Sequence, residues 1–153
     1  MNRYASCTAL TMIAVSLTMT AQERKVEESA LPAPVRKAMQ GQTQGATIKS
    51  YTTEVENGKR LYEAQTIVNG HTRDISVEAN GTLSEIEEEV AFDSLPATVQ
   101  AALTKRAAGA KITKVESLTK HGKLVAYEAA TLRGTRRGEI QVGPNGGKLS
   151  HEE

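Results

Sequence analysis

A short apolar sequence occurs twice in this chain, and the segments that follow the two copies are also alike. Leu31-Pro32-Ala33-Pro34-Val35 is matched 64 positions later by Leu95-Pro96-Ala97-Thr98-Val99. Glycines at positions 45 and 109 keep the same offset. The pattern predicts a tandem repeat, with one unit at 30–91 and a second at 92–153.

Each unit is expected to begin with an amphipathic helix. Prolines stand in the first turn, where amides lack an intrahelical acceptor and proline is tolerated. A glycine then ends each helix. The apolar stripe recurs every four residues, first as Leu31, Val35 and Met39 and then as Leu95, Val99 and Leu103.

After each glycine the pattern becomes extended and is interrupted by Asn-Gly pairs, which favour two-residue hairpin turns. His121-Gly122 takes the place of such a pair in the second unit. We predict four antiparallel strands in each unit. They lie near 46–56, 60–68, 72–79 and 82–90, and near 111–120, 123–132, 136–143 and 147–152.

The first strand of each unit carries the same irregularity. Ile48 and Tyr51 are three positions apart, as are Ile112 and Val115, whereas uninterrupted alternation requires two or four. A bulge at this place in both strands would return both residues of each pair to the core face.

The resulting fold class is α+β, a tandem repeat of one helix and a four-stranded antiparallel sheet. A unit of about 60 residues buries too little surface to be stable alone. We therefore expect the two sheets to join edge to edge into one eight-stranded sheet with both helices on one face.

The N-terminal residues 1–21 have the layout of a secretory signal peptide. Arg3 precedes an uncharged apolar run from Ala9 to Met19, and small residues follow it. The run is short for a membrane span, although a membrane anchor or a buried helix is the alternative. Residues 22–29 are polar and are expected to form a flexible leader. Cleavage would remove Cys7, the single cysteine, and would leave no membrane-associated segment.

The charge balance argues against a nucleic-acid partner. The chain has 19 Lys and Arg residues against 18 Asp and Glu residues, and the predicted signal peptide contains Arg3. The mature chain is then formally neutral, whereas nucleic-acid binders concentrate basic residues to neutralise phosphates. The few aromatic residues also provide no stacking surface.

Three groups of polar residues are candidates for small-ligand sites. The acidic run with Glu85 to Glu89 could attract calcium or a basic partner, but its side chains alternate between faces, which favours a solvated strand end. Arg133, Arg136 and Arg137 could hold an oxyanion, or could be solubilising turn charges. The three histidines are scattered, so we predict no metal site.

Catalytic chemistry is not indicated. No serine lies in a Gly-x-Ser-x-Gly setting, and the mature chain lacks a cysteine nucleophile. Asp74 and Glu139 occupy aligned positions in the two third strands, which favours a repeated surface position over a catalytic pair. We expect no enzyme activity, catalytic residue or cofactor.

The second strands predict the binding surface by exclusion. Tyr62 and Tyr127 could anchor a partner or could pack beneath the helices, and we favour packing. Period-two alternation then places three polar side chains on the helix-free face. These candidate binding residues are Glu63, Gln65 and Glu128.

The order of these features resembles the PepSY-like family, also called β-lactamase-inhibitor-like. The resemblance covers about Ser29 to Leu149. It rests on Leu-Pro at a helix start, Gly-Ala at the helix end, a kinked strand, Tyr-Glu-Ala in the next strand and Asn-Gly before a last strand. The resemblance implies an exported bacterial protein, periplasmic or secreted, that binds or inhibits another extracytoplasmic protein without catalysis. The alternative is a periplasmic small-ligand or cation sensor.

The β-lactamase inhibitor related to this family binds its target protein through a concave sheet rich in aromatic residues, and its units are disulfide-bonded. The mature chain has few aromatic residues and no cysteine. The resemblance therefore implies a fold and a binding role, but no particular target and no contact residues.

Overall fold

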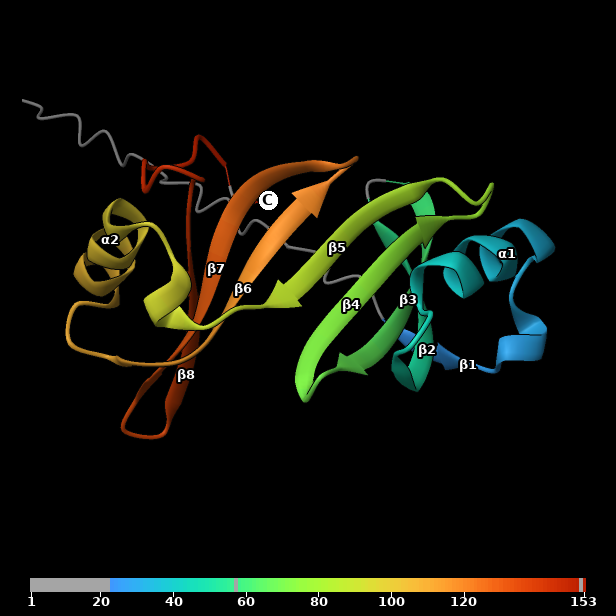
Figure 1. Ribbon diagram of the computed structural model, residues 1–153, viewed down its shortest axis with the longest axis horizontal. Coiled ribbons are helices and arrows are strands. Elements are labelled where there is room, and N and C mark those ends of the chain that lie inside the picture. The colour runs from blue at the N-terminus through green and yellow to red at the C-terminus, as the bar shows by residue number, and fades with distance from the viewer. Residues whose placement is uncertain (1–22, 57, 152) are drawn as a thin grey trace, which may run out of the picture.

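The computed structural model describes residues 23–56, 58–151 and 153, and the expected signal peptide at 1–21 lies outside them. One antiparallel sheet of eight strands has its strands in chain order from β1 to β8 (Figure 1). Two helices, α1 (Ala33–Gln42) and α2 (Ala97–Ala107), accompany it, each preceded by a short 3₁₀ turn. The strands are β1 (Arg24–Val26), β2 (Thr47–Glu56), β3 (Lys59–Val68), β4 (His71–Glu78), β5 (Leu83–Glu89), β6 (Lys111–Lys120), β7 (Lys123–Arg133) and β8 (Arg136–Val142).

The predicted α+β class and the single eight-stranded sheet are confirmed, but one of the eight strands differs. β1, within the segment 22–29 expected as a flexible leader, pairs with β2 through Lys25 and Thr52. The strand predicted at 147–152 is wrong, since residues 147–151 are irregular. Its counterpart β5 is paired on both sides, by β4 and β6, whereas a strand after β8 would have one neighbour.

The duplicated irregularity is confirmed as a register shift in both strands. It lies between Ile48 and Ser50 in β2, and between Ile112 and Lys114 in β6. Ile48 pairs with Thr66, which lies on the same side of β3 as Ala64, so Ile48 is on the helix side as expected. Its side chain is nevertheless 40% exposed. Ile112 packs against the core of the second half, as expected.

Each helix covers its own part of the sheet. In α1, Val35 and Met39 pack against Ala64 of β3 and residues of β4. In α2, Val99 and Leu103 pack against β6, β7 and β8. The register between β5 and β6 keeps both apolar clusters on one face of the sheet. The core residues are Leu31, Val35, Met39, Ala64, Ile75 and Val77 in the first half and Leu95, Val99, Leu103, Val115, Ala129 and Val142 in the second.

A glycine turn contacts the first turn of each helix. Gly81 follows β4 and Gly146 follows β8, and both have positive φ, +90° and +84°. A Cβ atom on Gly81 would lie 2.9 Å from the Pro34 carbonyl oxygen, and one on Gly146 would lie 2.5 Å from that of Thr98. Both the backbone conformation and the close approach therefore require glycine.

Within the described residues, neither helix has the length and apolarity needed to cross a membrane.

Candidate functional site

The face of the sheet opposite the helices is the candidate site, and we call it the open face. Tyr62 and Tyr127 are partly buried against the two apolar clusters, so they pack beneath the helices as expected. Their neighbours Glu63, Gln65 and Glu128 consequently lie on the open face, because successive side chains alternate across a strand. The binding role assigned to these three residues stays a prediction.

Strand register brings five carboxylates into a row across the open face. Asp74 of β4 lies directly opposite Glu87 of β5, and Glu116 of β6 lies directly opposite Glu128 of β7. Glu63 of β3 is diagonal to Asp74, since its own partner is Ser76. Glu87 and Glu116 are likewise diagonal across β5 and β6. We call these five residues the carboxylate row.

Apolar and hydroxyl side chains lie between the charged groups of the open face. Leu118 is 2% exposed and lies opposite Glu87, and Ala126 beside it is fully buried. Thr52, opposite Glu63, is also buried. Long glutamate side chains can cover such neighbours with their methylene groups. The open face therefore combines negative charge with an apolar base.

Cationic groups lie near the second half of the row. Lys114 Nζ is 2.7 Å from Glu116 Oε1, and Lys120 Nζ is 3.6 Å from Glu85 Oε2. Gln141 Nε2 donates to Glu128 Oε2 at 2.7 Å.

The other half of the row has no such cation. Among the described residues, no salt bridge involves Glu63, Asp74 or Glu87. Three adjacent acidic groups of the open face therefore make no salt bridge within the described part of the chain, and the charge of Lys114 only partly offsets the rise in the pKa of Asp74.

Burial and mutual repulsion hold protons on these carboxyl groups. Desolvation, followed by the charge of Asp74, raises the pKa of Glu63 to about 7. Desolvation, followed by the charges of Glu85 and Glu116, raises the pKa of Glu87 to about 8. The pKa of Asp74 and that of Glu128 are also raised, mainly by desolvation. The row is therefore partly protonated near neutral pH.

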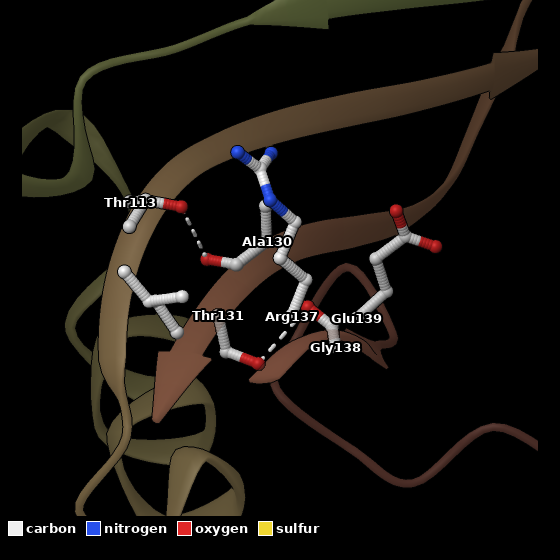
Figure 2. A pocket seen from close by; sticks show the side chains of 7 residues that line it. Thr113, Ala130, Thr131, Arg137, Gly138 and Glu139 are labelled. Carbon is white, nitrogen blue, oxygen red and sulfur yellow. Dashed lines mark hydrogen bonds between the residues drawn. The ribbon is translucent and has the colours of Figure 1, made fainter. Parts of the chain in front are cut away.

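A pocket of about 420 Å³ lies where β6, β7 and β8 meet (Figure 2). Its two hydroxyls are occupied, because Thr113 Oγ1 donates to the Ala130 carbonyl oxygen at 3.2 Å and Thr131 Oγ1 to that of Gly138 at 3.0 Å. No salt bridge among the described residues involves Arg137 or Glu139, which supply its charged groups. A neighbouring pocket of about 250 Å³ is lined by Glu128, Glu139, Ile140, Gln141 and Glu153.

The acidic run does not behave as the sequence suggested. Glu88 points to the helix side, where it lies 3.8 Å from the Arg73 guanidinium. Glu85, Glu87 and Glu89, however, share the open face with acidic residues of β4 and β6. The interpretation of the run as a solvated strand end is therefore wrong for Glu85 and Glu87, whose pKa values are raised mainly by desolvation.

The remaining candidates do not form sites. Asp74 and Glu139 belong to β4 and β8, with three strands between them, so they are not a carboxylate pair. Arg133 is used structurally, since its guanidinium donates to the carbonyl oxygens of Ala107 and Ala108 at the end of α2. Among the described residues, no three His, Cys, Asp or Glu side chains are arranged to hold a metal ion.

Sequence reasoning missed Asp74, Glu87 and Glu116 as parts of one surface. Period-two alternation does predict that Glu87 and Glu89 share one face and that Glu88 lies on the other. Joining them to β4 and β6 needs the register between strands, which no single strand specifies.

No protein-family model matches the chain, and no curated protein matches it. Solved structures do share its fold. A BLIP-like protein from Bacteroides fragilis superimposes with a TM-score of 0.58 and 20% sequence identity, covering 80% of this chain and 85% of that protein. The two proteins share helices packed on an open antiparallel sheet, in agreement with the β-lactamase-inhibitor-like resemblance.

Two further Bacteroides proteins support the same fold. A DUF2874 family protein from Bacteroides ovatus has a TM-score of 0.60 and 18% identity, covering 78% of this chain and 84% of that protein. A Bacteroides eggerthii protein, provisionally assigned to the periplasm, has a TM-score of 0.63 and 15% identity, covering 77% of this chain and 85% of that protein. None of the three is described by a catalytic activity.

Proposed function

We propose that this protein is an exported, noncatalytic binding or inhibitory module that engages another extracytoplasmic protein through its open face. Glu63, Gln65 and Glu128 are the contact residues first assigned to that face, and the rest of the carboxylate row joins them. The partner surface carries positive charge. The observation behind the proposal is the row itself, in which Glu63, Asp74 and Glu87 make no salt bridge among the described residues.

The row is unfavourable in the isolated protein. Like charges directly opposite one another in a sheet are destabilising, and Asp74 with Glu87 and Glu116 with Glu128 form two such pairs. Burial adds to the repulsion because it removes water from the charged forms. A basic partner surface would relieve this repulsion and would strengthen each contact by excluding water.

The apolar base gives a partner something to pack against besides charge. Leu118 and Ala126 lie within the open face and not in either helix-covered cluster. Protein interfaces usually surround an apolar centre with polar groups. The open face has both components, although it lacks the aromatic anchors that dominate many interfaces.

The location is proposed from two observations. The N-terminal pattern of residues 1–21 is that of a secretory signal. One protein of the same fold, from Bacteroides eggerthii, is provisionally assigned to the periplasm. A periplasmic or secreted partner follows from this placement. We favour a protein over a small ligand or cation because no group of potential metal ligands converges among the described residues.

The proposal is tested by capture from a periplasmic extract with purified mature protein. A variant with Glu63→Gln, Glu87→Gln and Glu128→Gln keeps the shape of the row but removes the charge of three of its five carboxylates. We expect the captured partner, once identified, to bind this variant at least about tenfold more weakly, and to bind the native protein more weakly at high salt.

The matched control is Glu88→Gln, because Glu88 neighbours Glu87 in β5 but lies on the helix side. This substitution should leave capture unchanged. Equal binding by the triple variant and the native protein, or loss of binding with Glu88→Gln alone, would exclude the open face as the contact surface.

A further inference from the structure

The two edges of the sheet differ in how they are protected. At one edge β1 has three residues, and short edge strands resist pairing with other chains. At the other edge β8 has seven residues. Among the described residues, no backbone–backbone hydrogen bond reaches β8 from any element except β7, and Glu153 bonds to the side chain of Gln141. β8 therefore offers a free set of backbone donors and acceptors.

The hairpin geometry identifies the free groups. Arg133 and Arg136 pair across a two-residue turn, so this pair exchanges backbone hydrogen bonds and alternate residues follow the same pattern. Gly138 and Ile140 consequently bond towards β7. The backbone groups of Arg137, Glu139 and Gln141 point outward, away from the sheet. The side chains of these three residues lie on the open face, because Gln141 is paired with Glu128 and Arg137 and Glu139 alternate with it along the strand.

We propose that β8 pairs antiparallel with β8 of a second copy of this chain, about a twofold axis at Gly138. In this register Arg137 of each copy lies directly opposite Glu139 of the other, so two opposite-charge pairs form. Cross-strand pairs of opposite charge stabilise a sheet. The second copy is thus selected by the charge pattern of the strand itself.

The neighbouring registers lack this complementarity. Centring the pairing on Glu139 places the two Glu139 side chains opposite one another, which is repulsive. Centring it on Ile140 pairs Glu139 with Gln141 and leaves Arg137 beyond the end of the opposing β8. Gly138 also suits the axis. The two Gly138 residues would form a pair without mutual backbone hydrogen bonds, in which the Cα atoms approach to about 4.5 Å.

The side chains required for this pairing are available. Arg137 and Glu139 are exposed and make no salt bridge among the described residues. They border the pocket of about 420 Å³ drawn in Figure 2. A twofold axis perpendicular to the sheet would place both open faces on the same side of the dimer. This inference concerns the β8 edge and does not depend on the proposed basic partner.

The test is the mass of the purified mature protein in solution, measured by sedimentation equilibrium. An interface of one strand pair is small, so we expect the average mass to rise from monomer towards dimer between about 10 µM and 1 mM. Arg137→Glu and Glu139→Arg alone should each keep the protein monomeric over this range. The double exchange, with both substitutions, should restore the dimer because it restores both charge pairs.

A second variant separates edge pairing from general damage. Glu139→Pro removes an outward amide donor but no hydrogen bond to β7, a position where an edge strand tolerates proline. The folded variant, checked by circular dichroism, should stay monomeric at 1 mM. A native protein that is monomeric throughout, a dimer that persists in Glu139→Pro, or a double exchange that fails to dimerise would each overturn the proposal.

Discussion

The two faces of the sheet follow different physical rules. On the helix side, Ala64 and Ala129 are fully buried, and Val77 and Val142 are at most 1% exposed. On the open face, strands of both halves contribute the carboxylate row. The helix side is arranged to maximise apolar burial, whereas the open face holds groups that repel one another. The difference indicates that stability is provided by one face and binding by the other.

The same comparison distinguishes the two halves of the open face. Glu63 and Glu128 occupy corresponding positions, and among the described residues Glu128 accepts a hydrogen bond from Gln141 of the neighbouring strand, whereas the hydrogen-bond partner of Glu63 is Gln65 of its own strand. Glu116 has Lys114 beside it, whereas Asp74 and Glu87 have no salt bridge among the described residues. The uncompensated charge is concentrated on β3, β4 and β5, and a basic partner is expected to contact those strands most closely.

The largest expected effect comes from a truncation on the helix side. Leu103 is fully buried in the second core, so Leu103→Ala should lower the free energy of unfolding by about 3 kcal/mol through lost burial and a residual cavity. Thermal or urea unfolding monitored by circular dichroism measures this loss.

Gln65→Ala is the corresponding truncation on the open face, where Gln65 accepts one hydrogen bond from Ser50. It should change stability by about 1 kcal/mol or less. Equal losses for the two variants would mean that the faces do not divide stability and binding as described.

The next largest effect is expected at the glycine turn that contacts α2. Gly146→Ala introduces a Cβ atom 2.5 Å from the Thr98 carbonyl oxygen at a residue with positive φ, and should lower the free energy of unfolding by about 2 to 3 kcal/mol. Gly70 also has positive φ, but a Cβ atom there would meet no atom within 4 Å.

Gly70→Ala therefore isolates the backbone contribution and should lower the free energy of unfolding by about 1 kcal/mol. Urea unfolding of the two variants gives the difference between them. A Gly70→Ala variant as unstable as Gly146→Ala would show that the contact with α2 adds nothing.

Local patterns in the sequence were sufficient to predict most of the fold. Helix stripes, the Asn69-Gly70 turn and the three-residue spacing at Ile112 depend on near neighbours, and the structure agrees with each of them. Asn80-Gly81 and Asn145-Gly146 differ, since the first lies in a longer loop between β4 and β5 and no strand follows the second. The strand Arg24–Val26 was not predicted because a three-residue polar segment has no recognisable period. Its formation depends on the free edge of β2, a tertiary feature.

The candidate site was only partly predictable for the same reason. Alternation within one strand correctly placed Glu63, Gln65 and Glu128 on the helix-free face. The opposition of Asp74 with Glu87 depends on how β4 and β5 align, and a register shift between Ser76 and Val77 lies in that pair. Within a strand the sequence gives the face of each residue, but the assembly of a surface needs the alignment of neighbouring strands.

A pH dependence of stability is also expected, and it originates on the open face. The folded protein raises the pKa of Glu63 to about 7 and that of Glu87 to about 8, from an ordinary value near 4.5. Between pH 4.5 and about 8, these two carboxyl groups bind more protons in the folded state than in the unfolded state. Stability should therefore decrease as pH rises from about 5 to 8.5. The lowered pKa of Glu89 has the opposite sign, but it acts below pH 4.5.

Melting temperatures at constant ionic strength across this range measure the slope. Glu63→Gln combined with Glu87→Gln replaces two titrating groups by neutral ones, so it should flatten the slope and make the variant more stable than the native protein at pH 8.5. Glu88→Gln, on the helix side of the same strand, should leave the slope unchanged. A native melting temperature that rises with pH over this window would contradict a desolvated carboxylate row, because groups whose pKa is raised by folding destabilise the folded protein as they ionise.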